Sequence, residues 1–397
     1  MSAADQILVT LQHRLVALVP PGFQPAISTL LIIFGIMAVF AVAFAMTTIA
    51  ERKILGRIQN RHGPNRVGPF GILQPIADGV KMLTKEDIVP AAADKTLHFL
   101  APLVLTVPIW LAFSVLPFGR NMAALDLDAG VLFFFAIGSA SELAVFMAGW
   151  SSQNKYSLMG AMRAIAQMIS YEVPLVLSTV PVLMAAGSLS LAQIVQAQSG
   201  YAAGFVPRWN VLTPWGLAAF VLFLIAAAAE SNRSPFDLPE GESEIIAGYL
   251  TEYSGFKYAL FFLGEYLGLF AVTGLAVTLF LGGWRAPLKI LEFVPSWIWF
   301  AAKFCALIFL FIWARGTVPR LRLDQLLNLA WKFLVPLALV NIFAAAVWSM
   351  SRRWLPIFEP VEIRWLLTAL ILAGPYAWLG RRVNPRPSPQ RVYVYVE

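Results

Sequence analysis

The sequence has little of what a soluble or cofactor-binding protein of its size carries. Charged residues make up only 13% of the 397 residues, against about 25% in soluble domains. A single cysteine, Cys305, excludes an internal disulfide framework and any iron–sulfur cluster held by this chain alone. The three histidines are scattered, and no glycine-rich phosphate-binding motif follows a strand pattern. These absences argue against a redox cofactor, a nucleotide or a metal in this chain.

Apolar residues are abundant instead. They make up 59% of the chain, with 29 Phe and 13 Trp and a mean hydropathy of +0.72. They form blocks of roughly 18–30 residues, long enough to cross about 30 Å of hydrocarbon as helices. The first block begins near Ala26 without a basic leader or a small-residue cleavage site, so we interpret it as a true span. The fold class we predict is all-α, a polytopic transmembrane helix bundle forming a single integral-membrane domain over residues 1–397.

Nine segments meet this length criterion, which places the two termini on opposite sides of the membrane. Most of the 29 Lys and Arg residues fall after the odd-numbered segments, and this excess marks the cytoplasmic side. We therefore expect a bacterial inner-membrane protein with its N-terminus outside and its C-terminus cytoplasmic. The net charge of +7 fits this bias and anionic lipid headgroups, so no nucleic-acid partner is needed. The nine predicted spans are residues 26–50, 99–118, 129–150, 158–187, 214–231, 258–284, 295–316, 326–350 and 363–380.

The long cytoplasmic segment 51–98 contains a pattern typical of an interfacial helix. Ile72, Ile76, Val80 and Leu83 recur at helical spacing, with Asp78 elsewhere around the turn. This periodicity predicts a short amphipathic helix lying at the membrane surface. The tail 381–397 is basic and rich in proline, which predicts an extended, solvated segment.

Four acidic residues lie in or at the end of otherwise apolar spans: Glu142, Glu172, Glu230 and Glu265. An acid at the centre of a membrane helix costs about 2.5–3.5 kcal/mol on insertion scales, so each is expected to face protein or water. Counted from the cytoplasmic ends, Glu230 is within about one turn and Glu265 and Glu142 are roughly seven or eight residues deep, with Glu172 near the midplane. Graded depth favours a half-channel for protons. The alternative is a structural role, with pairing to an arginine such as Arg163.

The stretch AESNRSPFDLPEGESE, Ala229 to Glu244, concentrates acids where the fifth span ends. Pro235 and Pro239 restrict its backbone. Across the same face, segment 51–98 supplies a basic counterpart. An acidic and a basic loop together predict a docking platform for another protein, with room for a small amphipathic molecule. The carboxylates of the stretch are Glu230, Asp237, Glu240, Glu242 and Glu244.

Three long stretches resemble one known family. They are ERKILGRIQNRHGPNRVGPFGILQPIADGVKMLTKE, SELAVFMAGWSSQNKYSLMGAMRAIAQMISYEVPL and ESNRSPFDLPEGESEIIAGYLTEYSGFKYALFFLGEY. The family is that of the H-type membrane subunits of proton-pumping NADH:quinone oxidoreductase, respiratory complex I. The resemblance covers residues 26–350, whereas the ninth span, 363–380, and the tail are less characteristic.

The resemblance implies a subunit that joins the membrane arm to the peripheral arm of the complex. With the peripheral quinone-site subunits it forms a chamber for ubiquinone or menaquinone, and no cofactor is bound covalently. The resemblance also implies that a path of charged residues leads from this chamber towards neighbouring membrane-arm subunits. By matching motif, the quinone contacts are Arg52, Asp78 and Phe236, the acidic loop beside them is Glu230, Asp237, Glu240, Glu242 and Glu244, and the path continues through Glu265, Glu142 and Glu172.

Three alternatives stay open at the level of sequence. One is the homologous membrane subunit of a hydrogenase or ferredoxin-linked complex. Another is an independent proton-coupled secondary transporter, which also needs acids near the midplane. The third is a structural anchor for soluble enzymes. Identification of the subunits that purify with this chain separates all three.

The charge count generates a prediction about topology. A reporter fused after Glu397 is expected to be active on the cytoplasmic side, and one fused before Met1 on the opposite side. Activity of both fusions on the same side would contradict nine spans.

Overall fold

The computed structural model describes residues 3–202, 206–238, 247–354 and 360–383, and it is almost wholly helical there. Two two-residue strands, β1 Tyr201–Ala202 and β2 Val206–Pro207, pair antiparallel. The helices are α1 Ile7–Ala17, α2 Gln24–Ile58, α3 Gln74–Thr84, α4 Lys95–Ala112, α5 Gly130–Gly138, α6 Ala140–Ser151, α7 Lys155–Ala186, α8 Leu191–Ala197, α9 Pro214–Glu230, α11 Gly255–Phe280, α12 Ser296–Thr317, α13 Leu323–Leu329, α14 Val335–Trp354 and α15 Val361–Val383.

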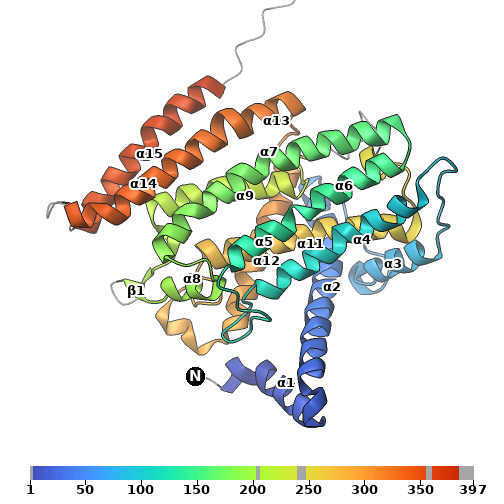
Figure 1. Cartoon of the computed structure of the whole chain (residues 1–397), viewed down its shortest axis with the longest axis horizontal. Coiled ribbons are helices and arrows are strands. Elements are labelled where there is room, and N and C mark those ends of the chain that lie inside the picture. The colour runs from blue at the N-terminus through green and yellow to red at the C-terminus, as the bar shows by residue number, and fades with distance from the viewer. Residues whose placement is uncertain (1–2, 203–205, 239–246, 355–359, 384–397) are drawn as a thin grey trace, which may run out of the picture.

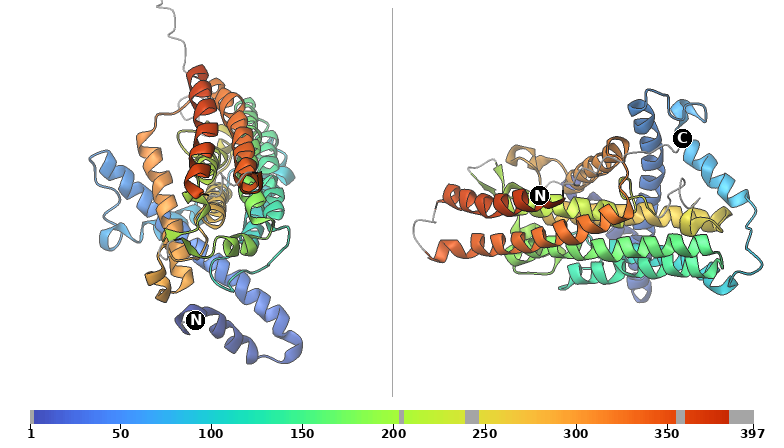
Figure 2. Two further views of the ribbon diagram at one scale, coloured as in Figure 1. Left: turned by 90° about the vertical axis from the view of Figure 1, so that its left-hand side faces the viewer. Right: turned by 90° about the horizontal axis from the view of Figure 1, so that it is seen from above.

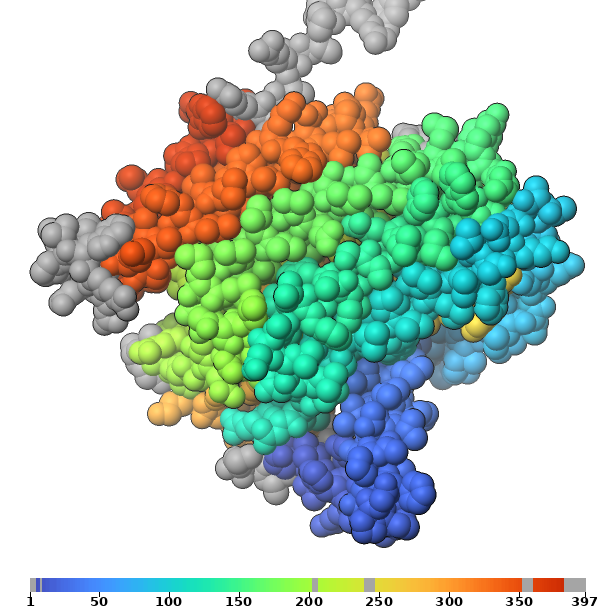
Figure 3. All heavy atoms as spheres, viewed as in Figure 1, coloured from blue at the N-terminus to red at the C-terminus, as the bar shows by residue number. Residues whose placement is uncertain are grey.

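The long helices form a bundle around α11. Helices α4 and α6 pack together, as do α6 and α7, α7 and α9, and α7 and α14, and α11 lies against α4 and α9 (Figure 1). The most apolar stretch of α11 is 72% buried, which makes it the central helix. Helices α4, α6, α7 and α14 form one continuous face in the space-filling view, below which α2 projects (Figure 3).

Helix α2 differs from the others in direction and in burial. It stands across the other long helices both in Figure 1 and in the right-hand view of Figure 2. Only 6% of its most apolar stretch is buried within the chain. An apolar helix this exposed fits lipid or a neighbouring subunit rather than water. Its C-terminal end is the exception, because Glu51 there is 5% exposed.

Side-chain caps and glycine set several helix ends. The Asp94 carboxylate accepts hydrogen bonds from the backbone N–H groups of Thr96 and Leu97, and the Asn154 side chain accepts from Tyr156. These caps satisfy donors that the first helical turn leaves unpaired. Helix α7 ends at Gly187, whose φ of 68° lies in the left-handed region that glycine adopts without strain.

The prediction of an all-α transmembrane bundle is confirmed. All nine predicted spans are helical in the described residues, and eight helices are long and apolar enough to cross a membrane. The fifth, α9, is a shorter apolar helix of 17 residues. The first span was predicted to end at residue 50, whereas α2 continues to Ile58, because charged residues end an apolar run without ending a helix.

The amphipathic helix predicted in segment 51–98 is present as α3. Its apolar residues Ile76, Val80 and Leu83 are exposed, by 64%, 55% and 67% respectively. Exposure of a whole apolar face is what an interfacial helix requires. The membrane placement itself stays a prediction.

Candidate functional site

A buried ion cluster lies where α2, α11, α12 and the residues after α9 meet. The Glu51 carboxylate on α2 accepts a hydrogen bond from Arg315 of α12 and one of 2.6 Å from the Tyr266 hydroxyl of α11. The same carboxylate lies 3.6 Å from Arg233, and the Arg233 guanidinium lies 3.8 Å from the centre of the Tyr266 ring. Glu51 and Arg233 are 5% and 9% exposed, so this is a desolvated ion pair.

The partners of Arg233 keep its charge in this buried position. Burial acts to lower the pKa of Arg233, but Tyr266, Glu51 and Glu265 together raise it above its ordinary value. Arg233 is therefore a fixed cation that interacts with carboxylates on two helices, Glu51 on α2 and Glu265 on α11.

The sequence pattern alone assigns no role to Glu51, Tyr266 or Arg315. Glu51 directly follows an apolar run, where it is read as a loop charge, and its partner Arg315 is 264 residues away along the chain. The usable signal was the continuation of helical periodicity from α2 through Glu51, which turns this side chain toward the bundle.

Asp237 belongs to the same region through a second pair. Its carboxylate lies 2.9 Å from Arg320, and its Oδ1 atom is buried without a hydrogen-bond partner among the described residues. Burial raises the pKa of Asp237, and Arg320 and Arg315 oppose that rise without cancelling it. Asp237 therefore holds its proton to a higher pH than an ordinary aspartate.

The segment that carries Arg233 and Asp237 stays inside the protein. The Gln167 side-chain amide on α7 donates to the carbonyl of Ala229, at 2.6 Å, and to that of Phe236, at 2.7 Å. These bonds satisfy the backbone just beyond α9, where a helix end leaves carbonyls unpaired. The chain thus turns within the bundle instead of leaving it at Glu230.

Phe236 faces the core in this structure. Its side chain is 5% exposed and packs against Tyr171 of α7, with ring centres 5.5 Å apart. The assignment of Phe236 as a quinone contact stays a prediction, and the ring is not among the residues that line the two cavities described below.

Three of the four predicted membrane acids form one group. The Glu142 side chain of α6 shares a hydrogen bond with Glu172 of α7, and Glu230 at the end of α9 interacts electrostatically with both. Glu230, at the end of the short helix α9, thus lies within electrostatic range of the other two, and the depths of the four acids in the membrane stay a prediction.

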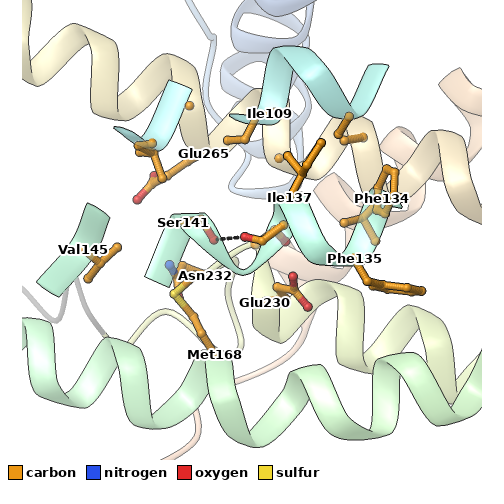
Figure 4. A pocket seen from close by; sticks show the side chains of 18 of the residues that line it. Ile109, Phe134, Phe135, Ile137, Ser141, Val145, Met168, Glu230, Asn232 and Glu265 are labelled. Atoms are coloured by element: carbon orange, nitrogen blue, oxygen red, sulfur yellow. Dashed lines mark hydrogen bonds between the residues drawn. The ribbon is translucent and has the colours of Figure 1, made fainter. Parts of the chain in front are cut away.

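Glu265 lies across a small cavity from this group. The cavity, of about 70 Å³, is enclosed by α4, α5, α6, α7, α9 and α11, with Glu230 and Glu265 in its wall. Figure 4 shows Glu265 on one side and Glu230 on the other, with Ser141 and Asn232 between them. About 10–15 Å³ of such volume admits one water, so the space has room for several waters beside its few polar groups.

Tyr249 fixes Glu265 on its side of the cavity. Its hydroxyl donates to the Glu265 carboxylate at 2.8 Å. Tyr249 reaches this position because α7 passes very close to the preceding backbone: a Cβ added at Gly160 would lie 2.6 Å from the Cα of Gly248. A glycine in α7 therefore sets the position of a side chain that binds Glu265.

The other predicted residues divide into one described pair and three that are not described. Arg52 and Asp78 form a salt bridge of 2.7 Å between α2 and α3, and the Arg52 side chain is 47% exposed. Arg52 and the Gln74 side chain, which also donates to Asp78, keep the pKa of Asp78 lowered despite partial burial. Glu240, Glu242 and Glu244 lie outside the described residues.

Comparison with known proteins gives a consistent result. A family model described as NADH dehydrogenase matches residues 31–346. The chain is 49% identical over 318 residues to the first H subunit of NADH-quinone oxidoreductase of Geobacter metallireducens, covering 78% of this chain and 92% of that protein. It is 51% identical to the H subunit of NADH-quinone oxidoreductase of Dehalococcoides mccartyi, covering 80% and 85%, and 48% identical to that of Geobacillus kaustophilus, covering 81% and 96%.

The buried ion pair generates a stability prediction. Glu51→Gln keeps the size and most hydrogen bonds of the side chain but leaves the Arg233 cation without this carboxylate. Breaking a buried ion pair in this way costs about 3–5 kcal/mol of folding free energy. We expect a clearly lower thermal unfolding midpoint for the detergent-solubilised protein. The control Glu86→Gln, which changes an exposed carboxylate, is expected to be nearly silent. The double variant Glu51→Gln/Arg233→Gln is expected to be less destabilised than the sum of the single variants. Additive losses would contradict the pairing.

Proposed function

The chain belongs to the family of NADH-quinone oxidoreductase H subunits, which are membrane subunits of complex I, and from this premise we propose that it passes protonation changes from a bound quinone to buried carboxylates. A continuous arrangement of charges carries the proposal. It runs from Glu51 through Arg233 to Glu265, across the cavity to Glu230, and from there to the hydrogen-bonded acids of α6 and α7.

The quinone site of this proposal lies at the end of the bundle that carries the ion cluster. Helix α3 packs on α2 and α11 there and keeps its apolar side chains exposed, which suits passage of an isoprenoid tail from lipid. Arg52 and Asp78 lie at the opening, and Arg233 and Asp237 lie deeper. A ubiquinone or menaquinone head group placed beside these residues would meet both a cation and a proton donor.

The proposed coupling between quinone reduction and proton movement follows from the change of charge that reduction causes. Reduction of a quinone to a quinol adds two electrons and two protons. The electrons arrive from other subunits, since this chain has one cysteine and no redox motif. Protons drawn from Asp237 or its neighbours change the charge beside Arg233, and Arg233 interacts with Glu265. Water in the cavity then allows protons to redistribute between Glu265 and Glu230.

The same arrangement suggests where partners bind. We place the peripheral quinone-site subunits against the cytoplasmic face formed by α3 and the residues around Asp237. The neighbouring membrane-arm subunits lie beside α6 and α7, which hold the far end of the carboxylate path. With the cytoplasmic face assigned in this way, the N-terminus lies outside and the C-terminus in the cytoplasm.

The carboxylate path generates a prediction for activity. Glu142→Gln, Glu172→Gln and Glu265→Gln are expected to leave the complex assembled, because a neutral amide is cheaper to bury than an unpaired charge. Quinone reduction coupled to proton pumping is expected to fall severalfold in each. The double variant Glu142→Gln/Glu172→Gln is expected to resemble the single variants, because both acids share one hydrogen bond.

The matched control is Glu362→Gln, which changes an exposed carboxylate on α15. Proton pumping and NADH-dependent quinone reduction are measured in the same proteoliposomes. Full coupled activity in the three path variants would leave these acids with a structural role only.

The shifted pKa of Asp237 generates a prediction for pH dependence. Because its pKa is raised, Asp237 is protonated up to a higher pH than an ordinary aspartate. Because the protonated form donates to the quinone, the wild-type rate is expected to decline on the alkaline side, at a higher pH than for an ordinary aspartate. Asp237→Asn is expected to lower the rate and remove this decline. Arg320→Gln removes a charge that opposes the rise, so the decline is expected to move to still higher pH.

Arg322→Gln is the control for the second variant, since Arg322 is exposed and only two residues from Arg320. Quinone reduction by the purified complex is measured across pH. Superimposable profiles for wild type and Arg320→Gln would exclude Asp237 from the rate-limiting protonation.

A further inference from the structure

We propose that a pocket at the opposite end of the bundle binds the head group of an aminophospholipid, with its phosphate at Arg285 and Arg120 and its ammonium group at Glu292. The pocket, of about 240 Å³, lies between the end of α11, the start of α12 and the residues that follow α4. It shares no lining residue with the carboxylate cavity. The site is therefore separate from the quinone reaction.

The backbone of this pocket is held rigidly. The Lys303 ammonium group of α12 donates to the carbonyls of Leu281, Gly283 and Arg285 at 2.6, 2.8 and 2.7 Å. The same ammonium group lies 4.1 Å from the ring centre of Trp209. Three bonds from one half-buried cation fix the loop after α11, so the Trp284 and Arg285 side chains start from an ordered backbone.

Two donors in the pocket wall have no partner among the described residues. They are Nε of Arg285 and the indole Nε1 of Trp284, and Trp284 is only 6% exposed. A buried donor left unpaired costs roughly 1–3 kcal/mol. An acceptor with several oxygens satisfies both donors at once, and phosphate matches the guanidinium of arginine in particular.

The charges point to the same ligand. Arg285 and Arg120 both line the pocket. Burial and the Arg120 charge lower the pKa of Arg285, and Glu292 opposes this only in part. Asp5 pairs with Arg120, with its Oδ2 3.9 Å from Nε, and its Oδ1 accepts from the backbone N–H and the hydroxyl of Ser296, so its contacts are to Arg120 and Ser296 and not to Arg285. Glu292, which interacts with the Tyr201 hydroxyl, supplies a carboxylate on the pocket wall. One phosphate and one ammonium group together match this set.

The surroundings favour a lipid over a free anion. The ends of α4 and α11 and the start of α12 lie at the same end of the bundle, so the pocket lies at a membrane surface if these helices span. Ile290 and Phe293, beside the pocket, are 82% and 71% exposed and offer apolar surface for acyl chains. A volume below the roughly 300–1,000 Å³ of drug-sized sites suits a single head group.

The test uses the intact complex in phosphatidylglycerol vesicles that contain a trace of photoactivatable phosphatidylethanolamine. After illumination, labelled peptides are quantified by mass spectrometry. Labelling is expected on residues 284–299, and Arg285→Gln is expected to reduce it about tenfold or more through loss of the phosphate partner. Arg208→Gln, an exposed arginine at the same end of the bundle, is the control and is expected to label as the wild type does.

The two parts of the head group are tested by competition. Replacing part of the phosphatidylglycerol by unlabelled phosphatidylethanolamine is expected to suppress labelling, and inorganic phosphate is not. Glu292→Gln is expected to abolish this preference for the amine. Trp284→Phe, which removes only the indole N–H donor, is expected to weaken labelling and serves if Arg285→Gln does not assemble. Equal labelling of Arg285→Gln and wild type, competition by phosphate alone, or no preference over phosphatidylglycerol would each overturn the proposal.

Discussion

The structure depends on one buried ion pair, that of Glu51 and Arg233. Each residue is almost completely removed from solvent, so each charge needs its partners: Arg233, Arg315 and the Tyr266 hydroxyl for Glu51, and Glu51 and Glu265 for Arg233. Glu51 belongs to the helix with the least burial in the bundle, and Arg233 belongs to a segment that turns inside it. The pair therefore ties the most loosely packed helix to the interior, and Tyr266 on the central helix contacts both members. Anything that changes the charge of Glu51 acts directly on the position of this turn.

The turn after α9 explains why the carboxylates lie close enough to interact electrostatically. Helix α9 has only 17 residues and ends inside the protein, where Gln167 binds the carbonyls that the helix end would otherwise leave unpaired. This places Glu230 beside Glu142 and Glu172 and leaves a space between Glu230 and Glu265. A full-length helix would have carried Glu230 to the membrane surface. The short helix thus creates both the acid group and the cavity.

The sequence predicted the helices well because length and apolar composition determine membrane spans almost by themselves. It also singled out Glu142, Glu172 and Glu265, since an acid in an apolar run is conspicuous, and their roles stay a prediction. It did not predict contacts for which the residue type alone does not show where the side chain points. Glu51 looks like a loop charge, Gln167 looks like any polar residue in a helix, and two flanking prolines do not reveal that the Phe236 ring turns toward Tyr171. Such contacts join residues far apart in the chain, and only the packing of the helices decides them.

The geometry allows coupling without a large movement of helices. At an effective dielectric constant of about 20, two unit charges about 4 Å apart interact by about 4 kcal/mol, and the energy falls only inversely with distance. A tenfold change in proton affinity needs about 1.4 kcal/mol. Arg233 contributes to the environment of Glu51 on one side and of Glu265 on the other. In the proposed function, a change of one charge at the quinone end would therefore alter the proton affinity of acids further along the path while the bundle stays packed. The bundle owes its rigidity to the hydrogen-bonded caps, the Gln167 bonds and the buried ion pair. These contacts are then not only structural, because a rigid bundle keeps the distances between charges short enough for electrostatics to act.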